Sequence, residues 1–294
     1  MSTLQDLKDL NADKEFFIGI DSDGCVFDSM EPKHKECFCP AFINNFNLQS
    51  VSKYARETWD FVNLYSQDRG CNRFHAVIKA LDLLRGRPEV QKRGIPIMEL
   101  PALKAWVKAE SKLGNPALKA ETDKTHNPEL GVVLQWSADV NDAVKKIIRG
   151  VPPFPLFRES LEKMRARADI IVVSQTPTEA LMREWAELGM DKLARFIAGQ
   201  ELGTKAEHLE YAAKGKYPSD KILMIGDAPG DLKAAQSVGV LFYPIIPGGE
   251  DESWKRFHDE ALEKFFGMSY AGAYQDALLA EFSKSLPEKA PWQK

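Results

Sequence analysis

Cysteine is scarce in this sequence, with four among 294 residues. All four fall in the first quarter of the chain: Cys25, Cys37, Cys39 and Cys71. This placement is unlike the disulfide framework of a small secreted domain, so reduced thiols are expected. A zinc site would have to use Cys37 and Cys39. Their Cys-x-Cys spacing is not the Cys-x2-Cys spacing typical of structural zinc, even with His34 and His75 as further ligands.

The sequence also lacks the features that direct a chain to a membrane or to nucleic acid. The first residues, MSTLQDLKDL, have neither the basic nor the apolar region of a secretory signal. No apolar run approaches the length of a bilayer span. A net charge of −4 gives no general attraction to nucleic acid or to acidic membranes. We therefore expect a cytoplasmic protein with no membrane or nucleic-acid partner.

A short apolar run near the start of the chain ends in closely spaced acids. The segment FFIGI, from residue 16 to 20, predicts a buried strand, and Asp21, Asp23 and Gly24 follow it directly. A calcium loop of the EF-hand type needs glycine at its sixth position and glutamate at its twelfth. Here the glycine is fourth and the twelfth residue is Pro32. Turn chemistry alone is a second alternative for the aspartates.

Helical periodicity dominates the chain from about residue 30 to 149. Apolar residues recur at helical spacing over 51–65, over 74–84 with Gly86 and Pro88 as a stop signal, and over 103–110. A further helix is expected over 138–148, behind a possible cap at Ser137. The segment VPPFP, residues 151–155, excludes a continuing helix and is predicted to be the return linker.

Helices alternate with short apolar strands after this linker. The predicted strands end near residues 174, 199, 227 and 245, and the predicted helices cover about 156–168, 177–188, 204–213 and the segment from 229. This alternation predicts an α/β fold, a doubly wound parallel sheet with helices on both faces. The predicted domains are a Rossmann-like core of residues 1–29 and 150–294, and an inserted helical cap of residues 30–149.

Polar residues follow three of the predicted strands. They are Asp21, Ser174 and Asp227, and Asp231 lies one helical turn beyond the last. Parallel strands direct their carboxyl ends to the same edge of a sheet, so we expect these side chains to meet there, together with Asp23. Buried carboxylates need a compensating cation, and oxygen ligands suit Mg²⁺. A basic residue would also be needed beside an anionic phosphate. Lys205 is the first candidate, with Lys214 and Lys216 as alternatives.

The order of these motifs resembles the haloacid dehalogenase superfamily, in particular its magnesium-dependent phosphatase branch. The resemblance rests on Asp-x-Asp-Gly-x-x-x-Asp from Asp21, then Ser174, then Lys205, then Gly-Asp-x-x-x-Asp from Gly226. It covers residues of about 14–29 and 150–245, and the helical insertion resembles that superfamily's cap of the first type. Cys25 stands where the family often has threonine, and Ala206 where it often has proline after the lysine.

The resemblance implies a phosphatase that works through an aspartyl-phosphate on a small phosphorylated metabolite. It implies Asp21 as nucleophile, Asp23 as acid and base, and Ser174 and Lys205 as phosphoryl ligands. It further implies Mg²⁺ held by Asp21, the backbone of Asp23, Asp227 and Asp231. Gly24 and Gln175 are expected at the phosphoryl group, and Arg69 and Arg73, in a glycine-containing segment of the cap, are candidate substrate ligands; a solvated connector is the alternative for that segment.

Other activities stay open at this point. The superfamily includes dehalogenases, which lack the second acid and against which Asp23 argues. It also includes phosphonate hydrolases with a cap lysine and sugar-phosphate mutases. A non-catalytic module that binds a metal or a phosphorylated ligand is the alternative from another class. The sequence names neither the substrate nor the oligomeric state.

Overall fold

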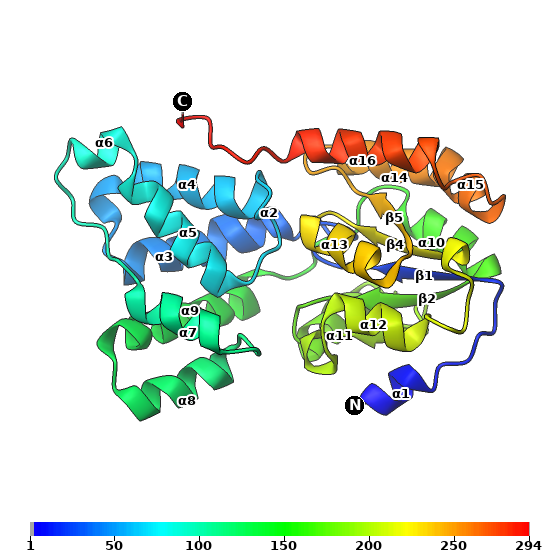
Figure 1. Cartoon of the computed structure of the whole chain (residues 1–294), viewed down its shortest axis with the longest axis horizontal. Helices are drawn as coiled ribbons and strands as arrows, with labels where there is room; N and C mark the ends of the chain where they lie inside the picture. The colour runs from blue at the N-terminus through cyan, green and yellow to red at the C-terminus, as the bar shows by residue number, and fades with distance from the viewer. Residues whose placement is uncertain (1–2, 294) are drawn as a thin grey trace. The chain divides into compact units, whose positions relative to one another are not determined.

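The computed structural model of the chain describes residues 3–293 and divides them into two compact units (Figure 1). The first unit runs to Met30 and resumes from Gly150 to Leu286. The second unit runs from Glu31 to Arg149 and includes the described chain from Pro287 onward. We call them the sheet unit and the helical unit. The helical unit is inserted between the first and second strands of the sheet unit.

Five parallel strands form the centre of the sheet unit. They are β1 (Phe16–Ile20), β2 (Ala168–Val173), β3 (Phe196–Ala198), β4 (Ile222–Gly226) and β5 (Leu241–Pro244), in the order β3-β2-β1-β4-β5. β1 is therefore the middle strand, with Ile20 opposite Val172 on β2 and Ile225 on β4. The predicted α/β class, a doubly wound parallel sheet with an inserted helical part, is confirmed.

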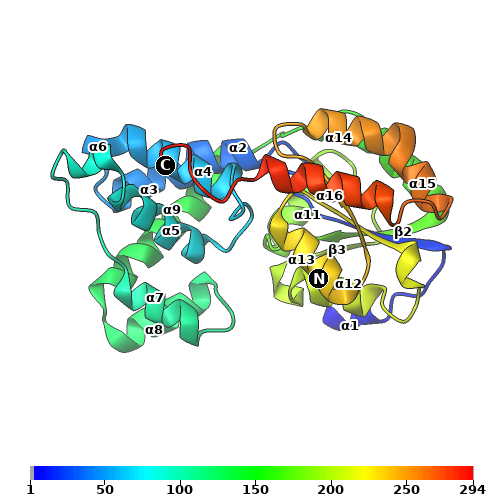
Figure 2. The same cartoon turned by 45° about the horizontal axis from the view of Figure 1, so that its top comes forward.

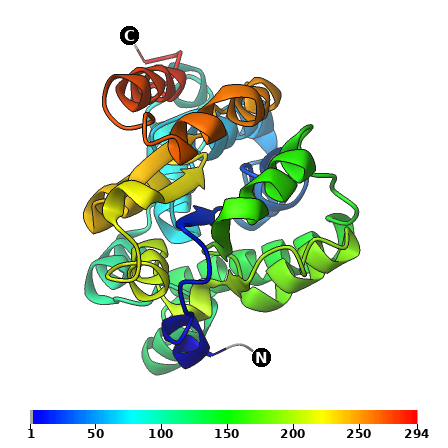
Figure 3. The same ribbon diagram turned by 90° about the vertical axis from the view of Figure 1, so that its right-hand side faces the viewer.

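Both faces of the sheet are covered by helices, because its strands are apolar on both sides. On β1, Phe16, Ile18 and Ile20 belong to one apolar cluster with Phe157 of α10, whereas Phe17 belongs to another with Leu209 of α12. Successive side chains of a strand point to opposite faces, so one strand supplies both cores. Figure 3 shows helices on either side of the strands. Because all strand pairs are parallel, the carboxyl ends of the strands lie at one edge of the sheet.

The helices of the sheet unit mostly follow the predicted ranges. They are α1 (Leu4–Lys8), α10 (Phe157–Arg167), α11 (Thr178–Glu187), α12 (Lys205–Ala212), α13 (Pro229–Val238), α14 (Glu250–Arg256), α15 (Leu262–Phe266) and α16 (Ala273–Ser285), with a π-helical turn η5 (Phe257–Ala261) and short 3-10 turns η3 (Gln200–Leu202) and η4 (Ser219–Lys221). The first helix and the last three α-helices of this list had no predicted counterpart.

The helical unit is an all-helical bundle with its own apolar core (Figures 1 and 2). Its elements are α2 (Met30–Pro32), which begins at the last residue of the sheet unit, the π-helical η1 (Lys33–Phe38), α3 (Cys39–Asn45), the 3-10 turn η2 (Gln49–Val51), α4 (Ser52–Leu64), α5 (Arg73–Arg85), α6 (Pro88–Gln91), α7 (Pro101–Ala109), α8 (Asn115–Thr125) and α9 (Pro128–Ile147). Trp59 and Trp136 pack edge to face at its centre, with 5.8 Å between ring centroids.

The start of α9 corrects one prediction. Ser137 was expected to cap a helix, but it lies buried inside α9, and its hydroxyl donates to Asn115 Oδ1 at 2.6 Å. The cap is Asn127, whose Oδ1 accepts from the amides of Glu129 and Leu130, with Pro128 as the first helical residue. An asparagine before a proline is a strong helix start, and it outweighs the isolated serine.

The described residues after Leu286 pack with the helical unit, although the sequence analysis assigned them to the core. Ala290 is buried in the helical core. The Trp292 ring lies 4.1 Å from the Arg87 guanidinium carbon and makes an edge contact with Phe61. Stacking of the guanidinium on the indole holds the residues after Leu286 on the helical unit. Such a contact cannot be predicted from a short-range sequence pattern.

Among the described residues, no helix has both the length and the apolar character needed to cross a membrane. The cytoplasmic location stays a prediction.

Candidate active site

Asp21 lies at the carboxyl end of β1, the middle strand of the sheet. Asp21 follows Ile20 directly, and its amide donates to the carbonyl of Ile225 on β4 at 2.9 Å. This bond continues the β1–β4 ladder by one residue, so the backbone of Asp21 is fixed by the sheet itself. Its side chain is buried, with 5% of the residue exposed. A carboxylate on such a support has little freedom to reorient.

Asp227 and Asp231 join Asp21, as the strand-end argument predicted. Asp227 follows β4, and Asp231 lies in the first turn of α13, where its Oδ2 accepts from the amide of Ala228 at 3.0 Å. One carboxylate oxygen from each of the three aspartates lies within 4.8 Å of the other two. Gly226 permits this close arrangement, since a Cβ there would stand 2.5 Å from Asp231.

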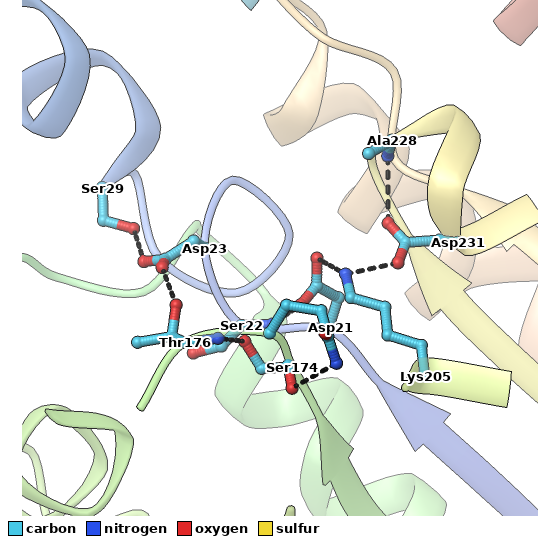
Figure 4. A network of polar contacts seen from close by, with 10 residues as sticks. Asp21, Ser22, Asp23, Ser29, Ser174, Thr176, Lys205, Ala228 and Asp231 are labelled. Atoms are coloured by element: carbon cyan, nitrogen blue, oxygen red, sulfur yellow. Dashed lines mark hydrogen bonds and ion pairs between the residues drawn. The ribbon is translucent and has the colours of Figure 1, made fainter. Parts of the chain in front are cut away.

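Lys205 is the lysine that reaches this cluster. It is the first residue of α12, and its Nζ lies 2.8 Å from Asp21 Oδ2 and 2.5 Å from Asp231 Oδ1 (Figure 4). The alternatives have other partners: Lys214 pairs with Glu210 at 3.3 Å, and Lys216 donates to the carbonyls of Lys8 and Tyr211. Of these three lysines, Lys205 is the one that contacts Asp21.

The electrostatics of the cluster are those of crowded carboxylates with one cation. Burial raises the pKa of Asp21 well above its usual range; Lys205 opposes this, and Asp231 and Asp227 add to it. Burial lowers the pKa of Lys205, but Asp21 and Asp231 outweigh burial and raise it. Lys205 is therefore a permanent ammonium. When ionised, the three carboxylates and the one ammonium have a formal net charge of −2.

This donor set fits a divalent metal ion. The formal charge of −2 on these four groups matches that of a divalent cation with opposite sign, and carboxylate oxygens are hard ligands. A bound cation would also favour ionised Asp21. Among residues 3–293, these aspartates are the group of at least three potential ligand residues that gathers closely enough for a metal. The cysteines and histidines weighed as zinc ligands form no such group there.

The Asp23 side chain is not part of the close carboxylate group, where it was expected. Its Oδ1 accepts a short hydrogen bond from Ser29 Oγ, and its Oδ2 accepts from Thr176 Oγ1 at 2.9 Å (Figure 4). The sequence analysis did not identify Ser29 or Thr176. Thr176 is separated from Asp23 by 153 positions, although its place two residues after Ser174 puts it at the same strand end.

Ser174 lies at the end of β2, as predicted, and is 2% exposed. Its amide donates to the carbonyl of Ala198, and its Oγ accepts from the amide of Thr176 at 3.2 Å. Because the Oγ already accepts one bond, its own proton remains a donor for a ligand oxygen. The side chain of Gln175 donates to the carbonyl of Gly203 at 2.9 Å, which links this loop to the start of α12.

Gly24 forms the tight turn after the first two aspartates. Its φ of +76° lies in the left-handed region, and its amide donates to the carbonyl of Phe27 at 2.9 Å. The neighbouring Cys25 is a core residue with 0% exposure. Burial and the nearby aspartates raise the pKa of its thiol well above the usual range, so it stays protonated and unreactive.

The two arginines proposed as substrate ligands lie in the helical unit and have structural contacts there. Arg69 is 4% exposed and donates from Nη1 to the carbonyl of Leu64 at 3.0 Å. Arg73 donates to Ser137 Oγ at 2.9 Å and to Asn141 Oδ1 at 2.8 Å. Burial lowers the pKa of Arg73 to about 10. These contacts give both residues a role in the fold, and substrate binding stays a prediction.

His208, one turn after Lys205 on α12, supports a test of pH dependence. Its side chain is fully buried, and burial, with a contribution from Lys205, lowers its pKa to about 4. Between pH values of about 6.5 and 4 the unfolded chain then binds a proton that the folded protein does not. The free energy of unfolding should therefore decrease as the pH is lowered through this window. At pH 5, His208 should account for about 2 kcal/mol of the decrease.

Urea unfolding at pH 7 and pH 5 measures this effect. His208→Leu should lose less stability between the two pH values than the unmodified protein, because leucine binds no proton. The titration of all other groups affects the two proteins equally. An equal loss in the two proteins would show that His208 does not carry the effect.

Comparison with protein-family models finds one match in this region of the fold. Residues 111–245 match the family described as haloacid dehalogenase-like hydrolase. The matched part contains β2 to β5, and with them Ser174, Lys205, Asp227 and Asp231. Asp21 and Asp23 precede it, but their strand lies in the centre of the same sheet. The helical insertion between β1 and β2 fits the position of a cap of the first type.

Solved structures with a similar chain trace include a predicted phosphoglycolate phosphatase from Haemophilus somnus 129pt, at 17% identity and a TM-score of 0.46, covering 82% of this chain and 92% of that one. A haloacid dehalogenase-like hydrolase from Streptococcus pneumoniae has 12% identity and a TM-score of 0.41, with 83% and 91% covered. A predicted phosphatase from Clostridium acetobutylicum has 15% identity and a TM-score of 0.41, with 79% and 84% covered. Comparison with curated proteins gives no match.

Proposed function

We propose that this chain is a haloacid dehalogenase-like hydrolase, the family that its residues 111–245 match, and specifically a Mg²⁺-dependent phosphatase that hydrolyses a small phosphate ester through an aspartyl-phosphate. One observation carries the proposal. The Asp21 carboxylate lies at the carboxyl edge of the middle strand, 2.8 Å from the Lys205 ammonium and beside Asp227 and Asp231. This arrangement supplies a nucleophile and the positive charge that an incoming phosphate requires.

The first half-reaction is a transfer of the phosphoryl group to Asp21. One Asp21 oxygen forms a bond to phosphorus, and the bond between phosphorus and the alcohol oxygen breaks. The carboxyl of Asp23 gives its proton to that departing oxygen, so that an alcohol leaves rather than an alkoxide. The Ser174 hydroxyl, the Lys205 ammonium and the backbone amides after Asp21 hold the phosphoryl oxygens, with Gln175 beside them and Gly24 allowing the close turn.

The second half-reaction returns Asp21 to its starting state. Asp23, now a carboxylate, takes a proton from a water molecule whose oxygen forms a new bond to phosphorus. The bond between phosphorus and Asp21 breaks, and inorganic phosphate leaves. Asp21, the backbone carbonyl of Asp23, Asp227 and Asp231 would hold Mg²⁺, which when bound offsets the repulsion between carboxylate and phosphate.

Substrate choice is assigned in this proposal to the helical unit, which takes the chain position of a cap. A small phosphorylated metabolite is the expected substrate class. The two chain connections near residues 30 and 150 would act as hinges that let the cap exclude competing water. If Arg69 or Arg73 contacts the substrate, its loss would raise KM for the natural ester more than for a small generic one.

A panel of phosphate monoesters assayed for released phosphate with added Mg²⁺ tests the proposal. We expect turnover of at least one alkyl phosphate. A mutase of the same family would instead return the phosphoryl group to a sugar, and a phosphonate hydrolase would act on a carbon–phosphorus bond and form a Schiff base. Binding of phosphorylated ligands without any turnover would favour a non-catalytic module and overturn the proposal.

A further inference from the structure

Two hydroxyl groups hold the Asp23 carboxylate, one on each oxygen. Ser29 Oγ donates to Oδ1, and Thr176 Oγ1 donates to Oδ2 at 2.9 Å (Figure 4). The two donors come from different segments, since Ser29 ends the turn after β1 and Thr176 belongs to the loop after β2. A carboxylate held in this way cannot rotate about its last torsion without breaking both hydrogen bonds.

Each hydroxyl is itself held by the sheet unit. Ser29 is 2% exposed, and the turn before it is closed by the hydrogen bond from the Gly24 amide to the Phe27 carbonyl. Thr176 is tied to Ser174, because its amide donates to the Ser174 hydroxyl at 3.2 Å. The loop after β2 therefore joins the expected phosphoryl ligand Ser174 to the expected acid Asp23.

We propose that Ser29 and Thr176 are positioning residues that fix the Asp23 carboxyl for proton transfer to the leaving oxygen. The inference rests on the proposed phosphatase function and adds the residues that orient its acid. Hydroxyl groups suit this task because a hydroxyl can accept as well as donate. Either partner can thus stay in contact when Asp23 gains or loses its proton, which an amide N–H could not do.

The dependence of rate on the leaving group distinguishes positioning from general support of the fold. An alkyl phosphate needs a proton on its departing oxygen, whereas nitrophenolate leaves readily without one. The measurement is kcat/KM, which reports the steps up to the first transfer. For an alkyl phosphate, Thr176→Val should lower kcat/KM about 10- to 100-fold, the loss typical of a misplaced catalytic group. For nitrophenyl phosphate the loss should be below about threefold.

Matched variants separate the hydroxyl from the loop. Thr178, two residues on at the start of α11, donates from Oγ1 to Glu201 at 2.7 Å, so Thr178→Val removes a neighbouring hydroxyl without touching Asp23. It should affect both esters alike. Thr176→Ser keeps the hydroxyl and should recover most of the alkyl phosphate rate lost in Thr176→Val. Ser29→Ala should show the same selective loss as Thr176→Val. This second variant keeps the test decisive if Thr176→Val does not fold.

A second measurement uses the Asp23→Asn background. If Thr176 acts through Asp23, adding Thr176→Val to Asp23→Asn should change kcat/KM for alkyl phosphate by less than about twofold. Equal losses for the two esters, or a full additional loss in the Asp23→Asn background, would overturn the inference. Failure of the proposed function has a different signature, because it would leave Asp21→Asn active or the unmodified protein without turnover.

Discussion

Asp21→Asn is expected to abolish phosphatase activity while leaving the fold intact. An amide is a poor nucleophile, so no aspartyl-phosphate can form, and turnover should fall by on the order of 10⁴-fold or more. The change is isosteric, and the amide of residue 21 can still donate to the Ile225 carbonyl, which is the backbone bond that fixes this position. The measurement is phosphate release from a reactive ester at saturating Mg²⁺.

The matched control is an aspartate at the other end of the sheet. Asp220 is exposed and lies in η4, just before the amino end of β4. Asp220→Asn removes the same charge without touching the cluster and should leave turnover unchanged. Substantial activity in Asp21→Asn with full activity in Asp220→Asn would refute the nucleophile assignment. Loss of activity in both would point to a general effect of charge or stability.

Most of the catalytic edge could be predicted because it is defined by strands. β1, β2 and β4 are short apolar runs, and each ends in a polar residue that the sequence shows directly: Asp21, Ser174 and Asp227. Parallel pairing then brings these ends together without any information on side-chain packing. Asp231 followed from helical periodicity alone. The positions of such residues follow directly from the strand and helix patterns in the sequence.

The hydroxyl partners of Asp23 could not be found in the same way. Ser29 and Thr176 are ordinary turn residues by sequence, and their common target depends on how two loops pack. The sequence analysis expected the Asp23 carboxylate at the same strand edge and the Asp23 backbone at the metal, and it named no partner for the carboxylate. In the structure these hydroxyl contacts hold its carboxylate, and Asp21 is the residue that joins Asp227 and Asp231.

The helical unit shows a similar limit. Periodicity located α4 and α5 within a residue or two, but the helix expected from residue 138 begins at Pro128. The apolar stripe continues toward the start of the chain through Leu130, Val133 and Trp136, which all belong to the core of this unit. The sequence analysis interpreted Ser137, which lies in the middle of this stripe, as the residue before the start of the helix. The signal that fixes the true start is the pair Asn127 and Pro128, which caps α9.

Removal of Mg²⁺ should abolish turnover, and its return should restore it. Three buried carboxylates lie close together, and the Lys205 ammonium contacts two of them, Asp21 and Asp231. The excess negative charge opposes the approach of an anionic phosphate to Asp21. Calcium should support activity poorly, because its larger and more flexible coordination would misplace the nucleophile. The measurement is activity after chelation and dialysis, followed by titration with each ion. Full activity in excess chelator, after bound metal has been removed, would contradict the metal requirement.

Asp227→Asn tests the same site without depending on catalysis. In the unmodified protein, Mg²⁺ at about 100 times its Kd should raise the free energy of unfolding by about 2.7 kcal/mol. Asp227→Asn removes a ligand, so this stabilisation should largely disappear. Each protein is compared with itself in the absence of metal, so that the effect of the lost ligand is separated from any change in stability caused by the substitution itself. Thermal unfolding of both proteins, with and without Mg²⁺, measures the two effects. An Asp227→Asn protein that keeps the full Mg²⁺ stabilisation would place the ion elsewhere, because a ligand of the bound metal cannot be lost without a change in affinity.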